Sequence, residues 1–400
     1  MASLTIDGGA ENSAGPWLAR LPERLLSRME QGHLHLALPG GRVLDARAAG
    51  CTVPEAHMQI NRWRAVRRIL VEGDIGFADG YIDDDWSSND LPALLELAAR
   101  NRNAIGSTIQ PSLVVRAVNR LVHLLRSNTR TGSRRNIVAH YDLGNDFYAH
   151  WLDRGMSYSS ALYQSPNQTL EDAQIAKQDR IVALMRAGEG ARVLEIGCGW
   201  GGLAERMVRI GMQVTGITLS PAQLAYAQTR LPGQADLRLQ DYRDSEGSYD
   251  RIVSIEMVEA VGERFWPVYF ERLKRLLAPG GRIVLQAITI DDGLFDGYRR
   301  EVDFIQRSIF PGGMLPTVEL IRQHFARAGL VLRSAEHFGE SYARTLAEWR
   351  RRFLVSWPAI EAMGFPPRFK RLWEYYLAYC EASFRSGSTN VGLYCAEHAD

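Results

Sequence analysis

A glycine-rich turn directly after an apolar run restricts this chain to a small set of folds. Residues 192–196 (RVLEI) predict a strand, and the sequence continues as Gly197-Cys198-Gly199-Trp200-Gly201-Gly202. Glycines allow a positive φ and a close approach of the backbone to a ligand, and a helix that begins after such a turn presents free N–H groups. The sequence therefore predicts a strand–turn–helix unit of an α/β sheet, with a candidate cofactor cradle at the turn.

Apolar runs and amphipathic segments alternate through the second half of the chain. Strands are expected at residues 192–196, 213–217, 235–240, 251–255, 281–287, 330–337 and 389–396. Helices are expected at residues 172–186, 203–210, 221–230, 265–277 and 318–328. Such alternation is typical of a parallel sheet covered by helices. The predicted fold class is α/β, a Rossmann-like doubly wound sheet with a smaller N-terminal α+β domain.

The position of the acidic residue at this turn separates two kinds of cofactor. Glu195 stands before the first glycine, whereas a nicotinamide-binding turn requires a GxGxxG pattern and an acid at the end of the second strand. The second predicted strand ends in Thr215-Gly216-Ile217-Thr218-Leu219-Ser220, without a carboxylate. A nicotinamide cofactor is therefore disfavoured.

The segment from Glu195 to Gly201 resembles motif I of class I S-adenosylmethionine-dependent methyltransferases, and the downstream layout of strands agrees with that family. The resemblance implies that S-adenosylmethionine is the cofactor and that Cys198 packs behind the turn. It implies cofactor contacts by the following residues: Glu195, Gly197, Gly199 and Gly201 at the turn, Thr218 and Gln223 at the ribose, Asp241 and Tyr242 at the adenine, and Tyr141 and Tyr158 over the cofactor.

Longer segments are similar to cyclopropane-fatty-acyl-phospholipid synthases, and they span nearly the whole chain. They are residues 140–148 (HYDLGNDFY), 156–161 (MSYSSA), 216–223 (GITLSPAQ), 254–262 (SIEMVEAVG), 310–316 (FPGGMLP), 341–346 (SYARTL) and 369–377 (FKRLWEYYL). The resemblance implies transfer of a methyl(ene) group to the double bond of an unsaturated acyl chain of a membrane phospholipid, which forms a cyclopropane fatty acid. The alternative is a methyl-branched, unsaturated product without ring closure.

The same resemblance implies the catalytic residues. Glu259 occupies the position of the family's catalytic Glu, and Tyr342 that of its catalytic Tyr. Ring-forming members use bicarbonate as the base, held by that Glu and Tyr with a Cys, a His and a backbone amide. Here Ser160 stands at the Cys position and Gln286 at the His position, and the amide is that of Ile288.

These departures leave several outcomes open. Ser and Gln still donate hydrogen bonds to an anion, but the loss of a His removes a group that is cationic near neutral pH. Ala260 also replaces a His of the family. Either bicarbonate is bound through Ser160, Gln286, Tyr342 and Ile288, or Glu259 itself is the base, or the reaction ends in an alkene. Tyr141, Tyr158 and Phe304 are candidates for stabilising a carbocation through their ring faces.

The chain is expected to begin with a tail (1–16) and an accessory domain (17–105). A basic helix and linker (106–136) and the catalytic domain (137–400) are expected to follow. Strands at 33–38 and 51–53, helices at 62–72 and 91–102, and a loop carrying Phe77, Tyr81 and Trp86 are expected in the accessory domain. The cysteines are scattered, with no CxxC pair and no His cluster beside them, so no metal site is predicted.

Charge is segregated along the chain although the total is close to zero. The formal net charge is +1, which disfavours a nucleic-acid-coating protein. No acidic residue lies between Glu96 and Asp142, and this interval includes the basic Arg116–Arg135 stretch. The stretch is expected either to meet anionic lipid at the inner face of the membrane or to be a solvated linker. With no apolar run long enough for a span, a cytoplasmic, peripherally associated enzyme is expected. The resemblance implies a homodimer.

Two other functions compete with lipid modification. One is methylation of a soluble small molecule on the same fold, and the other is a non-catalytic module that senses S-adenosylmethionine or supports a partner enzyme. The aromatic residues of the C-terminal section favour an acyl tunnel over a small polar pocket. They are Trp349, Phe353, Trp357, Trp373, Tyr375, Tyr376 and Phe384.

Overall fold

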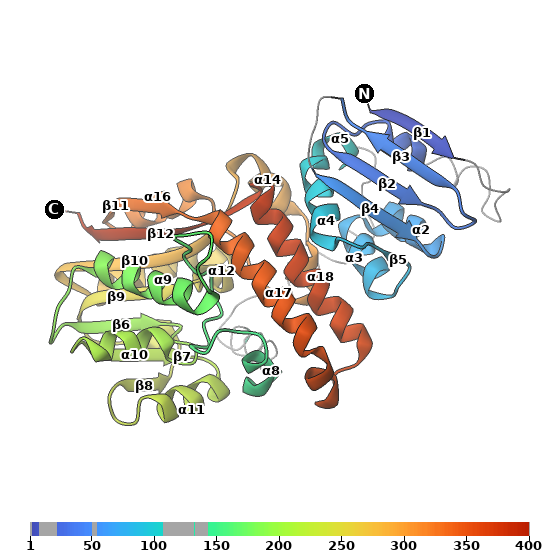
Figure 1. Cartoon of the computed structure of the whole chain (residues 1–400). Helices are drawn as coiled ribbons and strands as arrows, with labels where there is room; N and C mark the ends of the chain where they lie inside the picture. The colour runs from blue at the N-terminus through green and yellow to red at the C-terminus, as the bar shows by residue number, and fades with distance from the viewer. Residues whose placement is uncertain (1, 8–21, 50–53, 107–131, 133–142, 400) are drawn as a thin grey trace. The chain divides into compact units, whose positions relative to one another are not determined.

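The computed structural model describes residues 2–7, 22–49, 54–106, 132 and 143–399. The chain divides into two compact units (Figure 1). The N-terminal unit consists of residues 1–121, 301–304 and 357–388, and the core unit of residues 122–300, 305–356 and 389–400. This differs from the contiguous division expected from the sequence, because residues 301–304 and 357–388 belong to the N-terminal unit. No helix among the described residues has both the length and the apolar content of a membrane span.

The core unit is built on a seven-stranded sheet of order β11-β12-β10-β9-β6-β7-β8. The strands β10, β9, β6, β7 and β8 are parallel, and β12 is antiparallel to both β10 and β11. The strands are β6 (Arg192–Ile196), β7 (Gln213–Thr218), β8 (Asp236–Leu239), β9 (Tyr249–Ile255), β10 (Leu277–Ile290), β11 (Leu330–His337) and β12 (Thr389–His398). Every strand that the sequence predicts in this unit is present, with small shifts at the ends. The α/β fold class is confirmed.

Helices cover both faces of this sheet (Figure 1). Neighbouring residues on one strand, such as Val193 and Leu194, belong to apolar clusters on opposite faces, which explains why the central strands are apolar throughout. The helices of the core unit are α8 (Asn145–Ala149), α9 (Leu170–Met185), α10 (Gly202–Arg209), α11 (Pro221–Arg230), η1 (Tyr242–Asp244), α12 (Val258–Val261), η2 (Glu263–Phe265), α13 (Trp266–Leu276), α14 (Asp292–Arg300), α15 (Phe304–Ser308), α16 (Val318–Arg327) and α17 (Gly339–Ala362). The first residue of α15 and residues 357–362 of α17 belong to the N-terminal unit.

The N-terminal unit contains a five-stranded sheet of order β1-β3-β2-β4-β5. Helices α4 and α18 pack against each other, and α18 also contacts α3. Its elements are β1 (Ser3–Asp7), β2 (His33–Ala37), β3 (Val43–Arg47), β4 (Glu55–Ile60), α2 (Arg64–Glu72), α3 (Asp74–Ile82), β5 (Trp86–Ser87), α4 (Leu91–Arg100), α5 (Arg102–Gly106) and α18 (Pro367–Arg385).

One expectation about this unit is wrong. Phe77 and Tyr81 lie in helix α3, and not in the predicted loop, which was inferred from the glycines and aspartates around them. The glycines allow close packing instead of a turn, because a Cβ at Gly76 would lie 2.2 Å from the carbonyl oxygen of Arg68. A Cβ at Gly80 would lie 2.9 Å from the Trp86 ring. The expected strand at 51–53 lies outside the described residues, and the strand β4 begins at Glu55.

Candidate active site

The glycine turn after β6 is shaped by its backbone. Gly197, Gly199 and Gly201 have φ values of 84°, 52° and 82°, which side-chain-bearing residues rarely adopt. The N–H groups of Gly197 and Cys198 donate to the carbonyl oxygen of Ile217 on β7, at 2.9 and 3.0 Å. A Cβ at Gly199 would meet nothing within 4 Å. The turn is therefore anchored to the sheet on one side and open at Gly199, as a cofactor cradle requires.

The expected ribose and adenine residues follow β7 and β8 at the same edge of the sheet, where parallel strands end. The Thr218 hydroxyl donates to the side-chain oxygen of Gln223 at 2.9 Å, so the two side chains form one buried polar group. Asp241 forms an ion pair with Arg243 at 2.6 Å. Burial raises the pKa of Tyr242 to about 12, so its hydroxyl keeps its proton.

Glu195 lies at the end of β6 and is buried, and one of its carboxylate oxygens has no hydrogen-bond partner. Burial raises the pKa of Glu195 to about 8. A buried polar oxygen without a partner, beside a turn that is open at Gly199, fits a polar cofactor. Thr218, Gln223 and Asp241 follow the next two strands at the same edge of the sheet, and their contacts to the ribose and adenine stay predictions. Cys198 is buried in the apolar cluster behind the turn, as expected.

The centre of the site is a glutamate that the sequence analysis passed over. Glu256 follows strand β9, and its carboxylate accepts hydrogen bonds from the Ser160 N–H at 2.8 Å and from the Gln286 side-chain amide at 2.7 Å. The Tyr342 hydroxyl donates to its other oxygen at 2.6 Å. Glu256 has a φ of 49°, an unfavourable conformation for a residue with a side chain. Because it is the first acid after β9, its place in the sequence was the signal that could have identified it.

Glu259, on α12, lies beside this group. The Ile288 N–H donates to one of its oxygens at 2.6 Å, and its other oxygen is buried without a partner. The structure thus brings together Ser160, Gln286, Ile288, Glu259 and Tyr342, but around the carboxylates of Glu256 and Glu259. The donors of Gln286, Tyr342 and Ile288 that were expected to hold bicarbonate already donate to one of these two side chains. The Ser160 hydroxyl donates to the carbonyl oxygen of Ala161, and the Ser160 N–H donates to Glu256. An added anion at this position would also meet the negative charge of Glu256, so the described residues do not fit bicarbonate.

The two glutamates have different proton affinities. Burial and, to a smaller extent, the negative charge of Glu256 raise the pKa of Glu259 to about 8. Burial also raises the pKa of Glu256, but the hydrogen bonds from Tyr342, Ser160 and Gln286 oppose this shift because they favour the charged form. Near neutral pH, Glu259 therefore holds a proton, whereas the three hydrogen bonds to Glu256 favour its charged form.

A buried cation compensates for this negative charge. Lys177, on α9, donates to the Ser159 hydroxyl at 2.7 Å, and it interacts electrostatically with Glu256 and Glu195. Burial lowers the pKa of Lys177, while the carboxylates raise it. Lys177 was also missed in the sequence, because its position in an amphipathic helix gives no sign of burial.

The segment that carries Ser160 is held between α9 and α17. The Gln174 side-chain amide donates to the Ser159 carbonyl at 2.9 Å, and the Ala161 N–H donates to the Thr345 hydroxyl at 3.1 Å. Thr345 lies one helical turn after Tyr342 on α17, so the same helix fixes both the Ser160 amide and the Tyr342 hydroxyl. This arrangement makes the position of the Glu256 carboxylate rigid.

An aromatic cluster extends from the same segment. The ring of Tyr158 lies 5.4 Å from that of Tyr148, 5.6 Å from Trp151 and 5.4 Å from Trp349, measured between centroids. The ring of Trp349 in turn lies 6.1 Å from that of Tyr342. Ring faces here are suited to stabilise a cation on a bound substrate. Tyr141, the other aromatic residue expected over the cofactor, lies outside the described residues.

Other aromatic residues expected at the site lie elsewhere. Phe304 is buried in the N-terminal unit, with its ring 4.9 Å from that of Tyr375, so it does not belong to this group. The C-terminal aromatic section is divided: Trp349 and Phe353 belong to the core unit, and its later members to the N-terminal unit, where they are buried. The burial of the later members is explained by packing within the N-terminal unit, and the acyl tunnel expected from the whole section stays a prediction.

The doubly wound sheet, with Glu195 near the end of β6 and an open glycine turn after that strand, defines a class I S-adenosylmethionine-dependent methyltransferase. A mycolic acid cyclopropane synthase solved with SAH and CTAB has a TM-score of 0.63 and 28% identity, over 66% of this chain and 97% of that chain. Residues 128–393 match the family described as mycolic acid cyclopropane synthetase, and the chain belongs to this family.

Two relatives cover more of the chain than the family match does. Tuberculostearic acid methyltransferase of Mycobacterium tuberculosis is 38% identical over 93% of this chain and 90% of its own length. Cyclopropane-fatty-acyl-phospholipid synthase of Escherichia coli is 37% identical over 80% of this chain and 82% of its own length. The family thus includes enzymes named for cyclopropane products and for methylated fatty acids, and the chain is an S-adenosylmethionine-dependent methyltransferase.

Proposed function

We propose that this enzyme methylates the double bond of an unsaturated acyl chain in a phospholipid and so converts it into a methyl-branched, unsaturated acyl chain. Glu256 is the base of this reaction. The observation that carries the proposal is the Glu256 carboxylate, fixed by Ser160, Gln286 and Tyr342. A carboxylate that belongs to the chain itself and is held by three hydrogen-bond donors is a built-in proton acceptor.

The chemistry requires a positioned substrate, a stabilised cation and a base. When bound, S-adenosylmethionine supplies an electrophilic methyl group, whose bond to sulfur breaks as the π electrons of the acyl double bond form the new C–C bond. The acyl chain is left with a carbocation, which the partly exposed ring of Tyr158 is suited to stabilise. Glu256 takes a proton from a carbon next to the cation, and the C–H electron pair becomes the new double bond. Loss of a proton from the added methyl group would instead close a cyclopropane ring.

Two observations favour the branched product over the ring. The donors that hold bicarbonate in ring-forming enzymes are occupied here by Glu256 and Glu259, so a different base acts at this site. The relative named as a tuberculostearic acid methyltransferase covers 93% of this chain, including most of the N-terminal unit. This reverses the order of the two products expected from the sequence, and the cyclopropane product becomes the alternative.

The products decide between these outcomes. The enzyme is incubated with S-adenosylmethionine and vesicles of monounsaturated phospholipid, and the released acyl chains are examined by proton NMR. Mass alone is insufficient, because both products gain one CH2. Vinyl signals with a branch methyl group support the proposal, whereas upfield ring protons establish the cyclopropane. If no acyl product forms while a soluble small molecule is methylated, lipid modification is the wrong reaction class.

We further propose that the Arg116–Arg135 stretch, which lies outside the described residues, brings the enzyme to anionic membranes. The stretch lies in an interval without acidic residues, and arginines near a bilayer are attracted to its anionic headgroups. Sedimentation with anionic liposomes should weaken as salt rises, since salt screens such attraction. Binding that is absent, or insensitive to salt, would contradict this role.

A further inference from the structure

One face of the N-terminal sheet gathers histidines and carboxylates from three adjacent strands. Along β2, Leu34 and Leu36 are buried, so His33 and His35 lie on the opposite face. Strands β3 and β4 alternate in the same way and place Asp45, Glu55 and His57 on that face. The register pairs His35 with Asp45 on one side and with His57 on the other, and it pairs His33 with Glu55.

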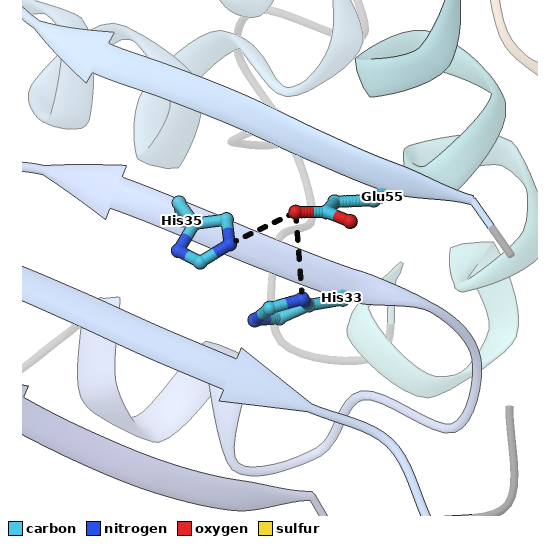
Figure 2. Close-up of side chains that lie close together, drawn as sticks. All are labelled: His33, His35 and Glu55. Atoms are coloured by element: carbon cyan, nitrogen blue, oxygen red, sulfur yellow. Dashed lines mark hydrogen bonds and ion pairs between the residues drawn. The ribbon is translucent and has the colours of Figure 1, made fainter. Parts of the chain in front are cut away.

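Asp45 fixes both rings of β2. Its two carboxylate oxygens lie 2.8 Å from Nε2 of His33 and 2.5 Å from Nδ1 of His35. Each ring is thereby held by one nitrogen, and the other nitrogen, Nδ1 of His33 or Nε2 of His35, faces Glu55 (Figure 2). A carboxylate that orients metal-binding histidines through their second nitrogen is a common feature of zinc sites.

One of the two nitrogens that face Glu55 has no hydrogen-bond partner. Nδ1 of His33 is buried and has no hydrogen-bond partner. It lies 3.9 Å from Oε1 of Glu55, and Nε2 of His35 lies 3.3 Å from the same oxygen. Ligand atoms of a tetrahedral zinc ion, with bonds of about 2.0–2.1 Å, lie about 3.3 Å apart. The 3.3 Å contact is a hydrogen bond of His35 and is also close to the spacing of two ligand atoms around a shared ion. The 3.9 Å distance of His33 is too long for a direct hydrogen bond.

We propose that His33, His35 and Glu55 bind one divalent transition-metal ion of the zinc type. The ligand atoms are Nδ1 of His33, Nε2 of His35 and Oε1 of Glu55, and all lie within 4.8 Å of one another. Imidazole and carboxylate ligands suit such an ion, and the charges of Glu55 and Asp45 balance its two positive charges. The ion lies outside the methyltransferase site and joins β2 to β4, so it stabilises the N-terminal unit.

His57 distinguishes this site from a set of surface ion pairs. Its ring stacks on that of His35, with centroids 4.6 Å apart and an angle of 10° between the planes. The rings of His33 and His35 lie 4.1 Å apart. Three imidazole rings are therefore gathered beside one carboxylate, and imidazole is a common ligand of such metal ions. His57 Nε2 lies 4.0 Å from the same Glu55 oxygen and stands next to the fourth coordination position, which water or His57 completes.

The test is metal binding by the full-length, untagged protein after treatment with a chelator. Zn²⁺ is added in competition with a chromophoric chelator, and Co²⁺ binding is followed through the visible absorption of a tetrahedral cobalt site. One equivalent of Zn²⁺ per chain is expected, together with a rise in Tm. Glu55→Gln and His35→Ala should abolish stoichiometric binding and the rise in Tm, and Asp45→Asn should weaken binding by about 10–100-fold because it frees the rings.

The variant His150→Ala is the matched control, since His150 lies in the core unit and outside this cluster. It should bind Zn²⁺ like the wild type. Glu55 lies largely at the surface, with 58% of its side chain exposed, so Glu55→Gln leaves the fold intact and keeps the test valid if His35→Ala misfolds. Wild-type protein that binds no Zn²⁺, or binds it no more tightly than folded Glu55→Gln, would overturn the proposal and leave a cluster of ion pairs.

Discussion

Replacing Glu256 with glutamine separates its role as a base from its role in the structure. In Glu256→Gln, the side-chain oxygen still accepts from the Ser160 N–H and the Gln286 amide. The new NH2 group faces the Tyr342 hydroxyl, whose oxygen is able to accept in place of donating. The shape of the site and its hydrogen bonds are therefore kept, and only the ability to take a proton is lost.

The expected effects on rate and stability differ in size. Loss of a general base reduces the rate by about 10²–10⁴-fold, or about 2.7–5.4 kcal/mol of activation free energy. The hydrogen bonds lose their charged acceptor, which costs about 1–2 kcal/mol of stability at most, and relief of a buried charge offsets part of this. Glu256 is not among the residues that hold the cofactor, so the KM for S-adenosylmethionine should stay close to that of the wild type.

The assay follows release of S-adenosylhomocysteine and formation of the acyl product, with Glu361→Gln as a control for an exposed glutamate. A kcat for Glu256→Gln within about threefold of the wild type would refute the assignment of the base. If Glu259→Gln is inactive while Glu256→Gln is active, Glu259 is the base, as the sequence alone suggested.

A second variant tests the interpretation of the hydrogen-bond donors. Glu256→Gly removes the carboxylate and suits the φ of 49° at this position. It leaves Ser160, Gln286 and Tyr342 facing a gap of carboxylate size. Added formate or bicarbonate should restore part of the lost rate in a saturable way, and neither should stimulate the wild type. Dependence of the wild type on bicarbonate would contradict our conclusion that this anion does not fit.

Three further predictions follow from the same contacts. Tyr342→Phe removes the 2.6 Å hydrogen bond that favours charged Glu256, so the pKa of Glu256 should rise. The acid limb of the kcat/KM profile should then move to higher pH, and activity near neutral pH should fall by about 10–100-fold. A pH profile that does not move would show that the role of Tyr342 is purely structural. The pKa of Glu259 is raised from 4.5 to about 8, so between these pH values the folded wild type binds more protons than the unfolded chain and loses stability as pH rises. In thermal denaturation, the Tm of Glu259→Gln minus the Tm of the wild type should therefore increase with pH. A difference in Tm that stays constant would contradict the pKa shift. Gly199→Ala should keep most of the stability of the protein but weaken S-adenosylmethionine binding, as measured by calorimetry. Gly201→Ala should lower the Tm more, because its Cβ would lie 3.1 Å from the Cβ of Ala227. Equal losses of stability in the two variants would refute this distinction.

Much of the core unit could be predicted from local patterns. The strand β6 and the helix α11 have the predicted bounds, since apolar runs and capping residues such as Ser220 act over a few residues. The helix α3 was missed because glycines that allow tight packing resemble glycines that make turns. Which of the two applies depends on the neighbouring element, here Trp86 and α2, and the local sequence does not specify it.

The candidate site was only partly predictable for a similar reason. Ser160, Gln286, Ile288, Glu259 and Tyr342 do lie together, but motif positions alone did not show that Glu256 is at their centre. A hydrogen-bond acceptor is selected by donors from distant segments, and their convergence is a property of the tertiary structure. The histidine cluster on β2 and β4 was missed in the same way, because strand pairing, and not spacing along the chain, brings its members together.

The sequence by itself determined the order of strands and helices and the glycine turn, because these depend on side-chain periodicity and on backbone freedom at single residues. The class of cofactor followed from the resemblance of that turn to motif I of the methyltransferases. Only the tertiary structure decided which carboxylate accepts the hydrogen bonds and which one retains its proton. Burial and the convergence of Ser160, Gln286 and Tyr342 set those properties, and both arise when segments almost two hundred residues apart in the chain pack against each other.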